Sequence, residues 1–116
     1  MTTNLDKAFE LANLMTVVAN QKRALKEEFE QATLYFYNGG TFTADRLLIS
    51  FLFAIKTTTQ SNMFVVIDDN GNPIQIEDLN KFFDDIVNLY AQSSNAYLAG
   101  YQTIKTHRSI SNILDL

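Results

Sequence analysis

The sequence predicts a mainly α-helical domain in which two long antiparallel helices form a coiled-coil-like hairpin. Long stretches near both ends of the chain repeat apolar residues at alternating spacings of three and four, and one proline and four glycines are spread over the 116 residues. An Asn-Gly pair between two apolar runs in the middle of the chain also predicts a two-stranded β-hairpin inserted between the long helices.

The first predicted helix covers residues 4–37. Thr3 precedes it as a candidate N-cap, and Asp6 follows at the spacing of a capping box. Lys22 interrupts its apolar seam, and Asn38-Gly39-Gly40 is interpreted as the helix stop. The apolar seam consists of Ala8, Leu11, Met15, Val18, Leu25, Phe29, Ala32 and Phe36. A helix of this length extends about 50 Å, so we expect it to pair lengthwise with another helix.

The middle of the chain predicts a short helix followed by the hairpin. Residues 44–56 form the helix, with Asp45 in its first turn. This segment is apolar all round, so we expect it to be buried, and its pattern alone leaves a buried strand open as an alternative. Residues 63–76 form the hairpin. Because an isolated hairpin is marginal in water, it has to pack on a helix or pair with another copy.

A second long helix is predicted over residues 79–107, with Asp78 as its cap and residues 109–116 as a tail. Ser93-Ser94-Asn95 and Gly100 are weak helix formers, which leaves a break or bend there open. Antiparallel packing of the two long helices brings Lys22 opposite Asp84 and Asp85. We hypothesise that Lys22 pairs with one of these carboxylates and fixes the register.

Several kinds of chemistry are disfavoured by the composition. The chain has no cysteine, which excludes disulfides, thiolate metal sites and cysteine catalysis. The single histidine, His107, lies beside Lys105 and Arg108 near the end of the last helix, where positive charge offsets the helix dipole. The glycines are too scattered for a phosphate-binding loop. We therefore expect no cofactor, no metal and no enzymatic activity.

Acidic residues give no clear metal or catalytic motif. The turn from Asp68 to Asn72 has a faint likeness to a calcium loop, but Pro73 and Leu79 stand where that loop needs Gly and Glu. Neighbouring carboxylates such as Glu27-Glu28 point in different directions on a helix. These residues are interpreted as solvated faces and helix caps.

Charge and hydropathy indicate no membrane span and disfavour nucleic acid as a partner. The net charge is −4, and the small basic group of Lys22, Arg23 and Lys26 is followed directly by acidic residues. The most apolar run, residues 47–55, is about half the ~20 residues that a spanning helix needs. No basic region precedes an apolar stretch at the N-terminus, so we expect no signal peptide and a cytoplasmic location.

The helix seams and the tyrosines point to protein contacts. Tyrosine is enriched at interfaces, and two long amphipathic helices leave apolar surface that one copy does not cover. The leading hypothesis is a non-enzymatic interaction or assembly protein acting as a homo-oligomer. Its predicted interface is formed by Leu11, Met15, Val18, Lys22, Leu25, Phe29, Tyr90, Tyr97 and Tyr101. A small-molecule binder or enzyme with a pocket under the aromatic residues is a further alternative.

The C-terminal residues Asn112-Ile113-Leu114-Asp115-Leu116 resemble the short acidic-hydrophobic peptides that phage and bacterial proteins dock into sliding clamps, although the usual Gln and terminal aromatic are missing. This resemblance implies an accessory protein that docks onto a nucleic-acid-processing machine through Ile113, Leu114 and Leu116. The Asn- and Thr-rich composition without cysteine or tryptophan is similar to that of small proteins from AT-rich genomes, including tailed phages.

Overall fold

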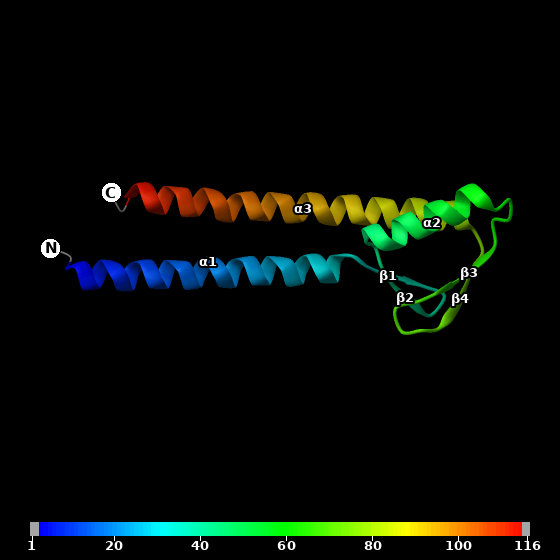
Figure 1. Ribbon diagram of the computed structural model, residues 1–116, viewed down its shortest axis with the longest axis horizontal. Coiled ribbons are helices and arrows are strands. Elements are labelled where there is room, and N and C mark those ends of the chain that lie inside the picture. Colours follow the sequence, from blue (N-terminus) through cyan, green and yellow to red (C-terminus); the bar gives the residue numbers. More distant parts are fainter. Residues whose placement is uncertain (1–2, 115–116) are drawn as a thin grey trace. The chain divides into compact units, whose positions relative to one another are not determined.

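The computed structural model describes the backbone of residues 3–114 and the side chains of residues 3–106 (Figure 1). Its elements, in chain order, are α1 (Asn4–Ala32), β1 (Leu34–Tyr37), β2 (Gly40–Thr43), α2 (Arg46–Thr58), β3 (Phe64–Ile67), β4 (Pro73–Ile76) and α3 (Leu79–Leu114). The chain forms two compact units. The two-helix unit contains the residues up to Phe29 and those from Ala96 onward, and the central unit contains Glu30–Asn95.

Helix α1 begins where the capping box predicts. The amide of Asp6 donates to Oγ1 of Thr3 at 3.2 Å, and the amide of Thr3 donates to Oδ2 of Asp6 at 3.3 Å. This reciprocal pair satisfies amides that have no partner inside the helix. The predicted end of the helix is wrong, because α1 stops at Ala32 rather than at residue 37.

Residues 34–43 form a β-hairpin in place of the last predicted turn of the first helix. β1 and β2 pair antiparallel, with Tyr35 opposite Phe42 and Tyr37 opposite Gly40. Asn38 and Gly39 have φ angles of 48° and 79°, the left-handed pair that a two-residue hairpin turn requires. β1 carries three aromatic residues and β2 carries Phe42 between two threonines, which suits a half-buried β surface. The Asn-Gly pair that we interpreted as a helix stop is therefore a strand turn.

The bounds of helix α2 and of the second hairpin are roughly those predicted, but the expectation that α2 is buried all round is wrong, because Leu47 is 80% and Phe53 is 56% exposed. α2 covers Arg46–Thr58 where residues 44–56 were predicted, and Oδ1 of its N-cap Asp45 accepts from the amide of Leu48 at 2.8 Å. β3 and β4 pair antiparallel, with Phe64 opposite Ile76 and Ile67 opposite Pro73, so both strands lie inside the predicted 63–76 hairpin.

Helix α3 is longer and more regular than predicted. It begins after Asp78, whose Oδ1 accepts from the amide of Lys81 at 3.1 Å, and it continues to Leu114. Helix α3 continues through Ser93-Ser94-Asn95 without a break, and the buried Ser93 hydroxyl donates to the carbonyl of Ala32 at 3.2 Å. The predicted end at residue 107 is wrong, and most of the predicted 109–116 tail belongs to this helix. Residues 115 and 116 lie outside the described part of the chain.

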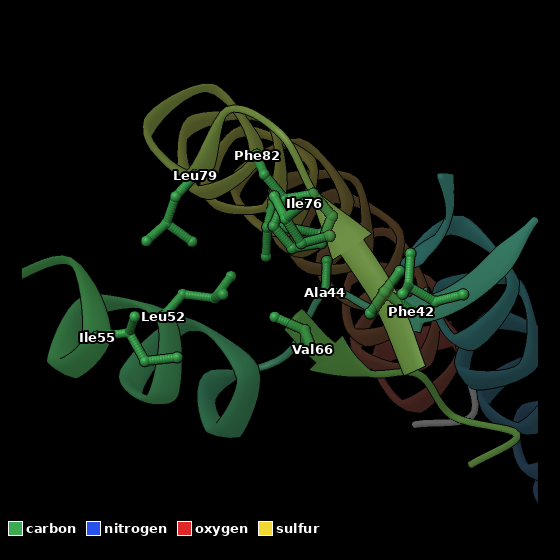
Figure 2. Packing of buried hydrophobic residues seen from close by; sticks show 10 residues of the cluster. Phe42, Ala44, Leu52, Ile55, Val66, Ile76, Leu79 and Phe82 are labelled. Atoms are coloured by element: carbon green, nitrogen blue, oxygen red, sulfur yellow. The ribbon is translucent and has the colours of Figure 1, made fainter. Parts of the chain in front are cut away.

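The apolar core of the central unit gathers buried side chains from β2, α2, β3, β4 and α3, and Tyr35 and Tyr37 of β1 pack against it (Figure 2). Phe42, Leu52, Ile76, Leu79, Phe82 and Ile86 are its largest fully buried members. Figure 2 shows Leu52 and Ile55 of α2 directed toward Val66 of β3 and Leu79 of α3. The strands therefore do not stand alone: α2 and the start of α3 cover their apolar face, as the prediction for an isolated hairpin required.

Phe82 is the centre of this core. Its ring makes edge-to-face contacts with Tyr35 at 5.6 Å, Tyr37 at 5.4 Å and Phe42 at 5.1 Å between centroids. Such aromatic pairs stabilise by about 0.5–1.5 kcal/mol beyond the area they bury. Phe82 of α3 thus packs against both strands of the unpredicted β1–β2 hairpin. Within the described residues, no helix combines the length and apolarity needed to cross a membrane.

Replacing Phe82 by Ala should lower the free energy of unfolding by about 3–5 kcal/mol, because a fully buried ring and three aromatic contacts are lost. Phe36→Ala is the matched control: Phe36 is 71% exposed, so its loss should change stability by less than about 0.5 kcal/mol. Urea unfolding followed by circular dichroism measures both. Equal stability losses in the two variants would contradict the central role of Phe82.

Candidate interaction surfaces

In the two-helix unit, α1 and the second half of α3 run antiparallel. Phe29 contacts Tyr97 edge to face at 4.8 Å between centroids, and Nζ of Lys22 lies 5.6 Å from the ring centroid of Tyr101. Between these contacts, the Leu25 side chain lies against Gly100, where a β-carbon on residue 100 would come within 2.6 Å of Leu25 Cδ1. Gly100, a weak helix former in the sequence pattern, therefore admits the Leu25 side chain.

The structure contradicts the predicted partner of Lys22. Its ammonium group lies over the Tyr101 ring, and Asp85 instead binds the Tyr35 hydroxyl and Nζ of Lys81. The prediction assumed a first helix ending at residue 37 and a last helix ending at residue 107. Because α1 is shorter and α3 longer, the helices pair in a different register, with Lys22 beside residues near 101.

The predicted interface residues on α1 share one property: none is buried. Across the whole of α1 no side chain is buried. Val18, Leu25 and Phe29 are half-buried, while Leu11 is 50% and Met15 is 62% exposed. Ile104 of α3 is the one buried apolar side chain of this unit within the described residues. The two helices thus leave much of their apolar surface uncovered.

The three predicted interface tyrosines do not all belong to the same compact unit. Tyr90 is half-buried against the apolar core of the central unit. Tyr97 and Tyr101 belong to the two-helix unit, and Tyr101 is the exposed one. Of the predicted docking residues, Ile113 and Leu114 are on α3 with side chains outside the described set, and Leu116 lies outside the described residues. Docking through them stays a prediction.

An open groove of about 400 Å³ lies in the central unit among β2, β3 and the first half of α2. Leu47, Leu48 and Phe51 form its α2 wall, and Val65, Val66 and Ile67 form its β3 wall. Phe42, Thr43, Asp45 and Asp69 complete the lining. The sequence pattern does not reveal this groove, because its walls come from segments far apart in the chain. The signal present was the apolar Val65 and Ile67 on either side of a buried Val66.

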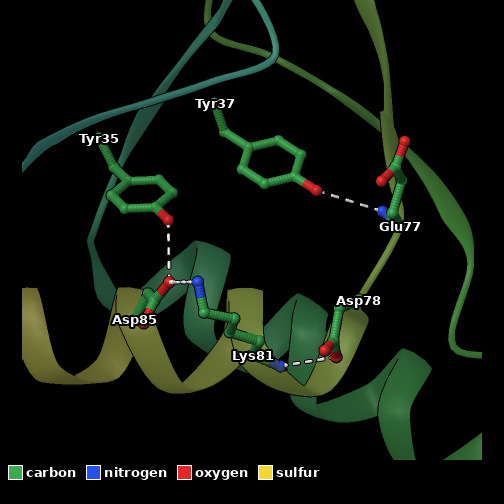
Figure 3. A network of polar contacts seen from close by, with 6 residues as sticks. All are labelled: Tyr35, Tyr37, Glu77, Asp78, Lys81 and Asp85. Atoms are coloured by element: carbon green, nitrogen blue, oxygen red, sulfur yellow. Dashed lines mark hydrogen bonds and ion pairs between the residues drawn. The ribbon is translucent and has the colours of Figure 1, made fainter.

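A network of polar contacts between β1 and the start of α3 has a structural role (Figure 3). The Tyr35 hydroxyl donates to Oδ2 of Asp85 at 3.0 Å, and the Tyr37 hydroxyl accepts from the amide of Glu77 at 3.3 Å. Lys81 lies 3.9 Å from Asp85 and is largely exposed, so this ion pair contributes little. Burial, with the hydrogen bond to Asp85 second, raises the pKa of Tyr35 to about 12. The phenol therefore stays protonated and holds the hairpin to α3.

The acidic turn after β3 also has a structural role. The Asp68 carboxylate accepts from the amides of Thr41 at 3.0 Å, Asn70 at 3.1 Å and Asn72 at 2.7 Å. These amides, that of Thr41 first, lower the pKa of Asp68. Within the described residues, no group of three or more His, Cys, Asp or Glu side chains is placed to hold a metal ion. The carboxylate that began the faint calcium-loop likeness instead joins the second hairpin to β2.

The Tyr35 phenol should ionise above the ordinary pH range of a phenol, because its pKa is raised to about 12. Its unfolded-state pKa is 10.0 and its folded pKa is about 12, so its contribution to stability is complete below pH 10 and is lost as pH rises toward 12. An ultraviolet titration of phenolate formation in the wild type and in Tyr35→Phe should differ by a component near pH 12. A difference spectrum that titrates near pH 10 would contradict the buried hydrogen bond to Asp85.

Comparison with known proteins leaves the chain without a relative from which a residue role could be transferred. No protein-family model, no curated protein and no solved structure matches it. The two candidate interaction surfaces, the exposed apolar side of the two-helix unit and the groove of the central unit, are therefore interpreted from their own geometry and charge.

Proposed function

We propose that this chain is a non-enzymatic assembly protein that self-associates through its two-helix unit. The observation that carries the proposal is that α1, a helix of 29 residues, buries none of its side chains within one chain. Isolated helices are marginal in water, and most helical stability in proteins comes from packing an apolar face. A helix about 44 Å long with no buried residue therefore gains stability when another helix covers it.

Several large apolar side chains in the N-terminal half of α1 are exposed within one chain. The described contacts with α3 lie at Lys22, Leu25 and Phe29. Toward the N-terminus, the exposed large apolar residues are Leu5, Phe9, Leu11, Met15 and Val17. On a helix with 3.6 residues per turn these positions extend well beyond one seam. One neighbouring helix cannot cover all of them, which supports a bundle of more than two helices.

A second copy of the chain suits this surface because the charges of the two-helix unit nearly balance. Its basic residues are Lys7, Lys22, Arg23, Lys26, Lys105 and Arg108, and its acidic residues are Asp6, Glu10, Glu27, Glu28 and Asp115. Two such units approach each other without net repulsion, and symmetric self-association is the commonest mode of assembly of soluble proteins. The helices then bury apolar area at about 25 cal/mol per Å².

The polar side chains of the central unit support a role other than catalysis. Asp45, Asp68 and Asp78 each accept backbone amides at a helix start or turn, and Tyr35 is held protonated by burial and by Asp85. A general base has to have a pKa near the working pH and a free approach to its substrate. These groups stabilise local structure instead.

The proposal predicts a solution mass that is a multiple of 13.2 kDa. Changing both Leu11 and Met15 to Glu should raise the dissociation constant at least about tenfold, which corresponds to ~1.4 kcal/mol, because each introduced carboxylate would have to be buried without a partner. Light scattering behind size exclusion, over a range of concentrations, measures the mass. Both side chains are exposed within one chain, so the variant should keep its helical circular dichroism.

The control changes both Asn88 and Gln92 to Glu, because it adds the same two carboxylates at exposed polar positions of α3 that lie outside the two-helix unit. It should leave the mass unchanged. A concentration-independent mass of 13.2 kDa for the wild type would overturn self-association, and equal dissociation in both variants would show that net charge rather than the apolar surface controls the mass.

A further inference from the structure

Strand β2 is hydrogen-bonded to the turn that follows β3. The amide of Asp69 donates to the carbonyl of Thr41 at 2.9 Å, and the Thr43 hydroxyl donates to Oδ2 of Asp69 at 2.6 Å. Beyond this point the strands belong to different two-stranded sheets. β2 turns away because the amide of Ala44 bonds to the carbonyl of Thr33 at 2.8 Å and α2 follows at once. The groove occupies the space that opens between them.

The edge of β3 that faces away from β4 carries unused backbone groups. The amide of Asp68 donates to the carbonyl of Asn72, so Val66, two residues earlier, also directs its N–H and C=O toward β4. By the same alternation, the N–H and C=O groups of Val65 and Ile67 point away from β4. Within the described residues these groups have no hydrogen-bond partner. Unpaired strand edges are templates for a further strand.

The side chains at this edge are apolar, and the lining of the groove includes the carboxylates of Asp45 and Asp69. Val65 is 54% and Ile67 is 61% exposed, and Leu47 and Phe51 are exposed on the opposite wall. Asp45 and Asp69 each accept one hydrogen bond through one oxygen, which leaves the other oxygen without a partner among the described residues. An occupant therefore needs apolar side chains along its length and positive charge near these two residues.

We propose that the groove binds an extended segment of a partner protein, which adds to β3 as a further strand and carries Lys or Arg beside its apolar residues. The charge of the central unit favours this occupant over a second copy. Its acidic residues (Glu30, Asp45, Asp68, Asp69, Glu77, Asp78, Asp84 and Asp85) outnumber its basic ones (Arg46, Lys56 and Lys81). Two copies joined through this unit would repel, whereas a basic strand is attracted.

The groove supplies both parts of strand recognition. The N–H and C=O groups of Val65 and Ile67 give main-chain hydrogen bonds that any extended segment can use. Alternate side chains of that segment then point toward the α2 wall at Leu47 and Phe51, which selects apolar residues. This surface is separate from the helices proposed for self-association, so one chain can assemble with its copies and hold a partner.

The test uses a short synthetic peptide that alternates valine and lysine, added to the full-length protein and followed by nuclear magnetic resonance. We expect slower amide hydrogen exchange at Val65 and Ile67 on binding, because their N–H groups gain carbonyl partners. A valine–glutamate peptide of the same length should bind at least about tenfold more weakly. The double variant Asp45→Asn and Asp69→Asn should remove most of this preference, since Asn keeps both local hydrogen bonds without the charge.

Val65→Pro distinguishes strand addition from general apolar contact. Proline removes the outward N–H of Val65, which has no role in the β3–β4 ladder, and proline is tolerated at strand edges. Its matched control is Gln75→Pro, because Gln75 stands opposite Val65 and directs its N–H to the outer edge of β4. Peptide affinity should fall at least about tenfold in Val65→Pro and stay unchanged in Gln75→Pro.

Three results would overturn the proposal. The first is that millimolar peptide does not slow amide hydrogen exchange at Val65 and Ile67. The second is that the lysine and glutamate peptides bind equally well. The third is that the two proline variants lose the same amount of peptide affinity. Protection of these amides that rises with protein concentration in the absence of peptide would assign the edge to a second copy instead. If the double Glu variant of Leu11 and Met15 keeps peptide binding while its mass falls, the two surfaces are independent, as expected.

Discussion

The burial of Phe82 is the interaction on which the rest of the central unit depends. Its ring is the point where α3 meets both strands of the first hairpin, through Tyr35, Tyr37 and Phe42. A two-stranded hairpin of four-residue strands is not stable by itself in water. Once Phe82 holds β1 and β2, Thr41 is placed to meet the turn at Asp68, and the second hairpin joins the first. The groove is lined by residues of both hairpins, so it depends on this contact between them.

The sequence predicted the local elements well because their signals are local. The capping residues Thr3, Asp45 and Asp78 occur where helices begin, and the Asn-Gly turn after β3 is flanked by apolar strands. β1 was missed because Phe36 continues the three-and-four spacing of α1, so the helical pattern covers a strand. What selects the strand is contact with Phe82, more than forty residues away, and short-range patterns do not contain it.

The same error displaced the candidate site. The predicted first helix ended five residues too late, and the predicted last helix ended seven residues too early. The prediction placed Lys22 opposite Asp84 and Asp85, whereas the structure places it over Tyr101. Leu25 and Phe29 were correctly placed on the side of α1 that meets another helix, yet both contact their own chain at Gly100 and Tyr97. The groove could not be predicted, because a strand edge becomes visible only when the pairing of β3 and the departure of β2 are both known.

The open edge of β3 is an unusual feature for a free protein to keep. Natural sheets protect their edges with charged side chains, prolines or bulges. β4 follows this rule in part, since Pro73 and Gln75 alternate with its buried residues, whereas β3 presents Val65 and Ile67. The β2 strand that could have covered them is drawn away by the Thr33 carbonyl and by the Asp45 cap of α2. An apolar edge without these protections, in a unit with excess negative charge, is a surface suited to a basic partner strand.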